Sequence, residues 1–308
     1  MTALVKKKIS VSSGCYNEAD NLREWYERVV KALKQFPQYD YEIVIADNYS
    51  NDGSREILRE IAATDKNFKV ILNSNNFGHI RSPHNALMNC SGDAVIQIVS
   101  DLQEPPELIP EMIRYWEKGY KVVVAVKPKS KENFFMSCIR KIYYYLLSKM
   151  SDSTYIVRNF TGFGLYDRQF IEAAKKFHSP YPYFRGLIGE IGFKRKEIEF
   201  IQEKRKHGKT KNNFFTLYDL AMTGFVNHSK LPLRLAAFTG FCIAGISLLV
   251  SFIYLVYKLL YWNTFSLGMA PVVIGLFFFS AIQLIFIGII GEYVGAILTQ
   301  VKNHPLVI

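Results

Sequence analysis

Two long stretches near the end of this 308-residue chain carry no charged side chain. Residues 235–257 and 259–291 contain no Asp, Glu, Lys or Arg. A helix needs about 20 consecutive apolar residues to cross the hydrocarbon core of a membrane. We therefore predict two transmembrane helices, at about 235–257 and 270–291. A buried hairpin in a soluble protein is the alternative, and two uncharged stretches of this length argue against it.

Basic residues flank the outer ends of the predicted pair of helices, at Lys230, Arg234 and Lys302. The positive-inside bias then places both termini and everything before the first span in the cytoplasm. The cysteines agree with a reducing compartment, because they are scattered without paired spacing: Cys15, Cys90, Cys138 and Cys242. The sequence predicts a multi-pass protein of the inner (plasma) membrane.

The positive charge is concentrated in one segment. Residues 127–211 carry 19 basic and 8 acidic side chains, an excess of +11 that equals the net charge of the whole chain, +11. Such a segment attracts anionic lipid headgroups or a phosphorylated lipid. Nucleic acid is the rival partner, and we expect none, because the membrane already supplies an anionic surface.

The first part of the chain alternates strand-like and helix-like stretches, which predicts a mostly parallel sheet covered by helices. The expected strands are Ile9–Ser12, Tyr41–Ala46, Phe68–Leu72, Ala94–Val99 and Lys121–Val126. The expected helices are Asp20–Phe36, Gly53–Ala63, Ile80–Cys90 and Pro106–Lys118. Ligands bind such sheets at the carboxyl ends of the strands, so the loops there are the candidate site.

Two later stretches, Phe134–Met150 and Phe214–His228, combine an apolar face with basic rims and aromatic residues. They are typical of helices that lie in the membrane interface, although ordinary amphipathic core helices would show the same pattern. We accordingly divide the chain into an α/β core at 1–126, a basic membrane-interface segment at 127–232 and the two spans with a short tail at 233–308.

Three of the loops carry recognisable motifs. They read CYNE at Cys15–Glu18, DNYSNDG at Asp47–Gly53 and SDLQEPPE at Ser100–Glu107. Together they resemble family 2 glycosyltransferases of the GT-A fold, whose pattern is P-x-Y-N-E, D-D-G-S-x-D and D-A-D-L-Q-D-P-P-E. The branch that transfers sugars to polyprenyl phosphates is the most similar, and it includes bactoprenol glucosyltransferases and dolichyl-phosphate mannose synthase. Further similar stretches are Asn159–Arg168, Arg205–Lys211 and Pro232–Leu235.

The resemblance implies an inverting transfer of a hexose, glucose from UDP-glucose, to undecaprenyl phosphate or a similar carrier, for the modification of cell-surface glycans. It assigns Asp101 and Gln103 to a Mg²⁺ or Mn²⁺ ion, with Asp101 catalytic. Such an ion neutralises the leaving diphosphate and prefers oxygen ligands. The nucleotide would be bound by Asp47 at the base, with Tyr16 and Glu18 beside base and ribose.

A lipid phosphate is already ionised near neutral pH, so the acceptor needs no general base. It needs cations that hold it in line with the anomeric carbon. The candidates are basic residues of the middle segment, with Arg205 best supported by its motif and counted as catalytic: Lys127, Arg140, Arg205 and Lys211.

The chain departs from the family pattern at three places. Val99 stands where the first Asp of D-x-D is expected, Asn48 replaces the second Asp of D-D-G-S, and Gly14-Cys15 replaces the proline. These departures leave open a catalytically impaired membrane scaffold. A transferase for mannose or another sugar is also open, because no motif identifies the sugar pocket. A processive synthase would need more helices and a Q-x-x-R-W motif, and this sequence has neither.

Glycines in the second span would permit packing into a homo-oligomer: Gly275, Gly288, Gly291 and Gly295.

Overall fold

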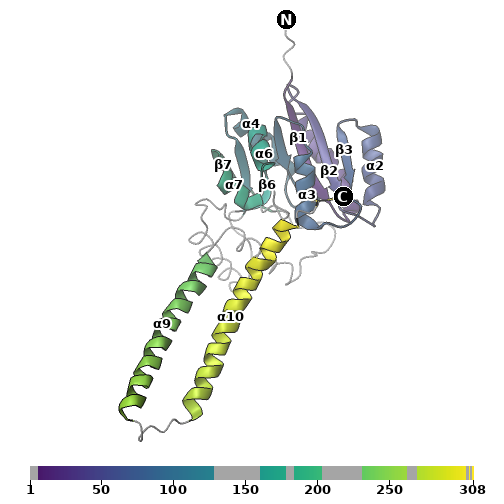
Figure 1. The fold of residues 1–308 in the computed structure, drawn as a ribbon. Coiled ribbons are helices and arrows are strands. Elements are labelled where there is room, and N and C mark those ends of the chain that lie inside the picture. Colours follow the sequence, from purple (N-terminus) through teal and green to yellow (C-terminus); the bar gives the residue numbers. More distant parts are fainter. Residues whose placement is uncertain are drawn as a thin grey trace.

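The computed structural model describes residues 6–127, 160–177, 184–202, 231–261, 269–302, 305 and 307–308. Its centre is a seven-stranded sheet with the strand order β3-β2-β1-β4-β6-β5-β7 (Figure 1). The strands are β1 Lys8–Cys15, β2 Asp40–Asp47, β3 Phe68–Leu72, β4 Ala94–Gln97, β5 Val122–Val126, β6 Phe160–Asp167 and β7 Arg195–Glu199. All five strands predicted from the sequence are present.

The sheet is mostly parallel, as predicted. β3, β2, β1 and β4 pair in parallel, and β5 pairs in parallel with β7. β6 is inserted between β4 and β5 and runs antiparallel to both. Since β6 and β7 lie within 127–232, the sheet extends beyond residue 126, into the segment that we expected to serve the membrane interface.

Helices cover both faces of the sheet. They are α1 Ala19–Leu33, α2 Ser54–Thr64, α3 Gly78–Met88, the short 3₁₀ turn η1 Pro106–Leu108, α4 Ile109–Glu117, α6 Arg168–Ala174 and α7 Phe184–Ile191. On one face α1 and α4 bury an apolar cluster that includes Trp25 and Met112. On the other face α3, α6 and α7 bury a second cluster that includes Leu87, Phe170 and Ile188. Valine and isoleucine fill the strands between the two layers, which is expected of a sheet covered on both faces.

Two long helices, α9 Leu231–Leu260 and α10 Met269–Val301, extend away from the sheet side by side (Figure 1). A Cβ atom on Gly240 of α9 would lie 3.4 Å from the ring of Phe286 of α10, so the two helices are in contact there. Among the described residues one window, Phe278–Leu298, is long and apolar enough to cross a membrane, with a mean hydropathy of 2.0 and none of it buried. Among the described residues of the first predicted span, the apolar stretch Ala236–Ile246 is shorter than a crossing needs, so this span stays a prediction.

The chain returns to the sheet after α10. The backbone N–H of Ser74, in the loop after β3, donates to the carbonyl oxygen of Ile308 at 2.8 Å. The tail therefore reaches the same edge of the sheet as the loops singled out by sequence. The two predicted interface helices, 134–150 and 214–228, lie outside the described residues.

Candidate functional site

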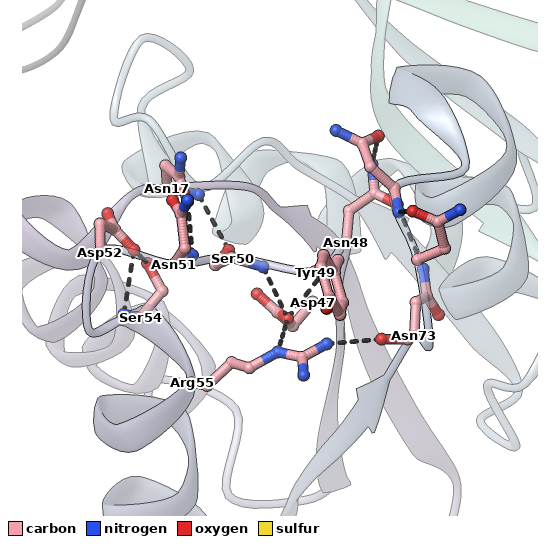
Figure 2. Close-up of polar contacts among 12 residues, drawn as sticks. Asn17, Asp47, Asn48, Tyr49, Ser50, Asn51, Asp52, Ser54, Arg55 and Asn73 are labelled. Atoms are coloured by element: carbon pink, nitrogen blue, oxygen red, sulfur yellow. Dashed lines mark hydrogen bonds and ion pairs between the residues drawn. The ribbon is translucent and has the colours of Figure 1, made fainter.

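The loops after β1, β2 and β4 meet at the carboxyl edge of the sheet and are tied to one another. The N–H of Asn17 donates to Ser50 Oγ at 2.9 Å, and the N–H of Asn51 donates to Asn17 Oδ1 at 3.0 Å (Figure 2). Ser100 Oγ, after β4, donates to the carbonyl of Gly14 at 2.9 Å. The three motif loops thus form one continuous surface.

Asp47, the last residue of β2, is fully buried at this edge. Its Oδ2 accepts hydrogen bonds from the N–H groups of Tyr49 and Ser50, both at 3.1 Å, and from Arg55 Nε at 2.6 Å (Figure 2). Its Oδ1 is buried and has no hydrogen-bond partner among the described residues. A buried acceptor left unpaired costs about 1–3 kcal/mol, so this oxygen is a candidate ligand contact.

Arg55, in the first turn of α2, was not singled out by sequence. Its guanidinium bonds Asp47 Oδ2 and the carbonyl of Asn73, at the end of the neighbouring strand β3. It also lies over the ring of Tyr49, 5.0 Å from the centroid. Tyr49 has a φ of 67° and a half-exposed side chain, so the turn presents this ring and the guanidinium together at the edge. An arginine eight residues after the motif aspartate was the available signal.

Tyr16 and Glu18 lie in the turn between β1 and α1. Tyr16 is half-buried, and Glu18 is 8% exposed immediately before α1. The Glu18 carboxylate accepts from Asn21 Nδ2 at 2.6 Å, and the backbone N–H of Glu18 donates to Ser54 Oγ at 3.0 Å. Glu18 therefore joins the starts of α1 and α2, and its contact with a nucleotide stays a prediction.

The loop after β4 is folded tightly around Leu102, a buried residue in the left-handed region with a φ of 60°. Asp101 Oδ1 accepts from the N–H of Gln103 at 3.1 Å. Glu104, two residues beyond Leu102, is buried beneath the loop. Its Oε2 accepts from the N–H of Val99 at 3.0 Å.

Glu104 also joins this loop to β6, because its Oε1 accepts from Thr161 Oγ1 at 2.7 Å. Burial raises the pKa of Glu104 to about 7, against the hydrogen bonds from Thr161 and Val99 that lower it. Sequence reasoning missed this residue. Its signal was the acid that the family pattern carries at the same place in D-P-P-E.

A short chain of exposed amides connects two of the predicted site residues. Gln202, just after β7, donates through Nε2 to Gln103 Oε1 at 2.9 Å and accepts from Lys127 Nζ at 2.6 Å. The structure thus brings Gln103 and Lys127 together through a residue that sequence did not single out. The other cation candidates, Arg140, Arg205 and Lys211, lie outside the described residues.

The oxygen ligands at this loop fit a hard divalent ion. Among the described residues no three His, Cys, Asp or Glu side chains gather into a metal cage. The Asp101 carboxylate and the Gln103 amide oxygen stand two residues apart in one turn. Mg²⁺ is commonly held by one or two carboxylates plus substrate phosphates, so this pair suits an ion whose remaining ligands come from a diphosphate.

The comparisons with known proteins agree with this geometry. Residues 10–173 match the model of glycosyl transferase family 2. The chain belongs to this family. It is 37% identical, over 95% of its length and 90% of the relative's, to the uncharacterized glycosyltransferase YkcC of Bacillus subtilis. It is 29% identical, over 97% of its length and 96% of the relative's, to the SfII prophage-derived bactoprenol glucosyl transferase of Shigella flexneri.

A solved structure shares the fold. It is glucosyl-3-phosphoglycerate synthase from Mycobacterium tuberculosis, in complex with Mg²⁺ and uridine diphosphate, with a TM-score of 0.50 and 16% identity over 71% of this chain and 77% of that one. The family match shows that the protein is a glycosyltransferase, and the solved structure shows a mixed α/β domain of the expected kind.

The departure at Asn48 has a visible structural consequence in this glycosyltransferase. The side chain is buried and hydrogen-bonded to the loop after β3, through Asn76 Oδ1 at 2.7 Å and the N–H of Phe77 at 2.8 Å. The other departure, Val99, is 39% exposed at the mouth of the Asp101 loop. Asn48 thus fixes the loop after β3 beside the site. At Val99 the surface of the site carries a valine where the family pattern has an acid.

Proposed function

We propose that this glycosyltransferase moves a hexose, glucose from UDP-glucose, onto a polyprenyl phosphate such as undecaprenyl phosphate at the cytoplasmic face of the membrane. One observation carries the proposal. A buried carboxylate oxygen of Asp47 that has no partner among the described residues, and the oxygen pair of Asp101 and Gln103, lie on loops that are bonded together at one edge. That arrangement suits a nucleotide at Asp47 and a diphosphate at Asp101. The name of the Shigella flexneri relative, a bactoprenol glucosyl transferase, supports the lipid acceptor.

On the donor side, Asp47 Oδ1 accepts an N–H of the base, while Tyr16 and Glu18 lie beside base and ribose. Arg55 Nε donates to the other oxygen of Asp47 at 2.6 Å and so orients the carboxylate. Asp101 and Gln103 would hold Mg²⁺ or Mn²⁺, which would neutralise the charge that develops on the leaving diphosphate. The presence of Mg²⁺ and uridine diphosphate in the structural relative supports this assignment.

On the acceptor side, Lys127 lies at the same edge, next to Gln202 and Gln103. Lys127 and the basic stretch that follows Gln202, with Arg205 and Lys211, bind the lipid phosphate together with Arg140. A phosphate oxygen attacks the anomeric carbon, the bond from that carbon to the nucleotide oxygen breaks, and the nucleoside diphosphate leaves with the electron pair. A single displacement inverts the centre, giving a β-linked sugar phosphate from an α-linked donor.

In this proposal the C-terminal helices anchor the site beside its lipid acceptor. We propose that α9 and α10 form a transmembrane hairpin with both termini in the cytoplasm, supported by the apolar window Phe278–Leu298 and the basic residues at the outer ends. Glycines along α10 would permit packing into a homo-oligomer. The segment 127–232 would lie at the membrane interface. The proposed boundaries at residues 126 and 232 separate donor binding, acceptor binding and membrane anchoring. The strands β6 and β7 of the middle segment nevertheless belong to the central sheet.

The decisive experiment supplies purified full-length protein in detergent with Mg²⁺, undecaprenyl phosphate and UDP-glucose carrying a ¹⁴C label in the sugar. We expect labelled lipid to form in the absence of EDTA and not in its presence, and NMR to show a β-linked sugar phosphate. GDP-mannose and other common donors in parallel reactions identify the sugar. An α-linked product would overturn the inverting mechanism.

The departure at Val99 motivates a second candidate, a membrane scaffold that keeps the fold without transfer. The loop lacks one acid beside the diphosphate, and an exposed valine stands in its place. The same assay separates the two candidates. Absence of lipid-linked label with every donor, from protein that stays folded, would favour the scaffold.

A further inference from the structure

The side-chain amide of Asn48 has a fixed orientation. Its Oδ1 accepts from the N–H of Phe77 at 2.8 Å, and its Nδ2 donates to the carbonyl of Gly78 at 3.3 Å and to Asn76 Oδ1 at 2.7 Å. A backbone N–H can only donate and a carbonyl can only accept. The oxygen of Asn48 must therefore face Phe77 and its nitrogen must face Gly78.

Asn48 in turn orients the amide of Asn73, which is 2% exposed at the end of β3. Asn73 Nδ2 donates to Asn48 Oδ1 at 3.4 Å and to Ser82 Oγ, on α3, at 3.0 Å. A flipped Asn73 would turn its oxygen toward that of Asn48. The amide oxygen of Asn73 therefore points away from both neighbours, and it is buried with no hydrogen-bond partner among the described residues.

This oxygen belongs to the same structural unit as the partnerless oxygen of Asp47. The N–H of Asn73 donates to the carbonyl of Asp47 at 3.0 Å, and Arg55 bonds both residues, through Asp47 Oδ2 and the Asn73 carbonyl (Figure 2). Two buried acceptors, neither with a partner in the part of the chain that the structure describes, thus stand on adjoining strand ends in the candidate donor site. Each is costly to leave unpaired, and a ligand with two hydrogen-bond donors would satisfy both.

We propose that Asn73 is a second nucleotide-recognition residue, whose Oδ1 accepts an N–H or O–H of the donor nucleoside beside Asp47, and that Asn48 is the positioning residue that orients it. The inference rests on the proposed donor site. It also gives a reason for the departure from the family pattern: an aspartate at position 48 would place an oxygen against the oxygens of Asn76 and Gly78.

The first test is calorimetric titration of UDP, and of GDP in parallel, into the detergent-solubilised full chain and its Asn73→Ala variant. We expect roughly 10-fold weaker UDP binding, the effect of one hydrogen bond lost from a buried acceptor. Ser82→Ala is the matched control, because it removes a partner of the same amide and leaves the acceptor in place. The affinity of Ser82→Ala for UDP should stay within about 2-fold of that of the original protein.

The second test identifies the nucleoside group with UDP analogues that lack one donor each: N3-methyl, 2′-deoxy and 3′-deoxy. Because Asp47 is proposed to accept the one N–H of uracil, the N3-methyl analogue should lose about 10-fold with both proteins. One of the two deoxy analogues should lose about 10-fold with the original protein and nothing further with Asn73→Ala, since its partner is already gone. Asn48→Ala removes the oxygen that accepts from Asn73 Nδ2, so it should abolish the same preference while Asn73 is unchanged. If Asn73→Ala does not fold, Asn73→Ser carries the measurement.

Unchanged UDP affinity in a folded Asn73 variant would overturn the inference and leave the proposed function standing. An equal loss for UDP and all three analogues would also overturn it, because it would show a structural role only. If the original protein binds neither UDP nor GDP, the proposed function fails and the inference fails with it.

Discussion

The two edges of the central sheet differ in how their buried polar oxygens are hydrogen-bonded. At the amino edge, Glu42 of β2 is 2% exposed and both of its oxygens are used. Oε1 accepts from Ser10 Oγ at 2.7 Å and from Ser91, and Oε2 pairs with Lys69 Nζ at 2.6 Å. Burial opposes ionisation, yet these hydrogen bonds lower the pKa of Glu42 to about 2.

Asp167 repeats this arrangement at the amino edge, where β6 ends. It accepts from Trp116 Nε1 at 2.8 Å, from Lys121 Nζ at 3.1 Å and from the N–H of Gln169 at 3.0 Å. Although burial raises it, these bonds lower its pKa overall. The cavity of about 460 Å³ at this edge is lined by Asp167 and Lys121, which are already paired with each other.

The carboxyl edge leaves two buried oxygens available. Asp47 and Asn73 each hold one buried oxygen without a partner among the described residues, whereas Glu104 at the same edge is bonded through both oxygens, as the acids of the amino edge are. The comparison teaches that burial alone does not distinguish a binding acid from a structural one. What distinguishes them is whether the protein itself supplies the hydrogen-bond donors. The predictions below test that difference, from the largest expected effect to the smallest.

Asp101→Asn should lower kcat by about 10²–10³-fold, because a metal that stabilises a leaving diphosphate contributes several kcal/mol to the transition state. The melting temperature should stay within about 2 °C of the original. Glu107→Gln is the control, since this acid of the same motif is paired with Arg28 at 2.7 Å, outside the site. The measurement is lipid-linked label against time at several Mg²⁺ concentrations. Equal activity of Asp101→Asn and Glu107→Gln would contradict the metal assignment.

Glu104→Gln should change how stability depends on pH. A carboxyl whose pKa is raised from 4.5 to about 7 in the fold binds its proton more tightly there than in the unfolded chain. Its contribution is present below pH about 4.5 and is lost as pH rises toward 7, on the order of 3 kcal/mol. The variant should show a flatter profile in denaturant unfolding across this range. An unchanged slope would show that Glu104 is not buried as described.

Glu42→Gln should cost about 2 kcal/mol of unfolding free energy at pH 7, the scale of hydrogen bonds to a charged group. Because the pKa of Glu42 is lowered to about 2, its contribution is present above pH about 4.5 and is lost as pH falls toward 2. The variant should lack this acid-sensitive part. Its transfer rate per folded molecule should be unchanged, and a large loss of kcat would erase the contrast between the two edges.

Thr161→Val should have the smallest effect, about 1 kcal/mol, because it removes one neutral donor to Glu104. That hydrogen bond lowers the pKa of Glu104, so its loss should move the pH dependence of stability to higher pH. Thr161→Ser keeps the hydroxyl and should behave as the original protein. The same unfolding series measures both variants.

The sequence by itself determined the alternating β/α order, the three motif loops and the apolar C-terminal stretches, because periodicity and local composition are written along the chain. It also placed Asp47, Asp101 and Gln103 at strand ends that the structure brings to one edge. It missed β6 and β7 as members of the central sheet, since the position of a strand between β4 and β5 depends on pairing with segments distant in sequence.

Only the tertiary structure decided which polar atoms are satisfied. Arg55, Asn73, Glu104 and Gln202 matter because of partners that lie up to 99 positions away along the chain, as in the bond between Gln202 and Gln103. The sequence showed Asn48 as a departure from the pattern of a family. The fold showed that its amide is bonded to a neighbouring loop, because a hydrogen bond depends on where donors and acceptors meet in space.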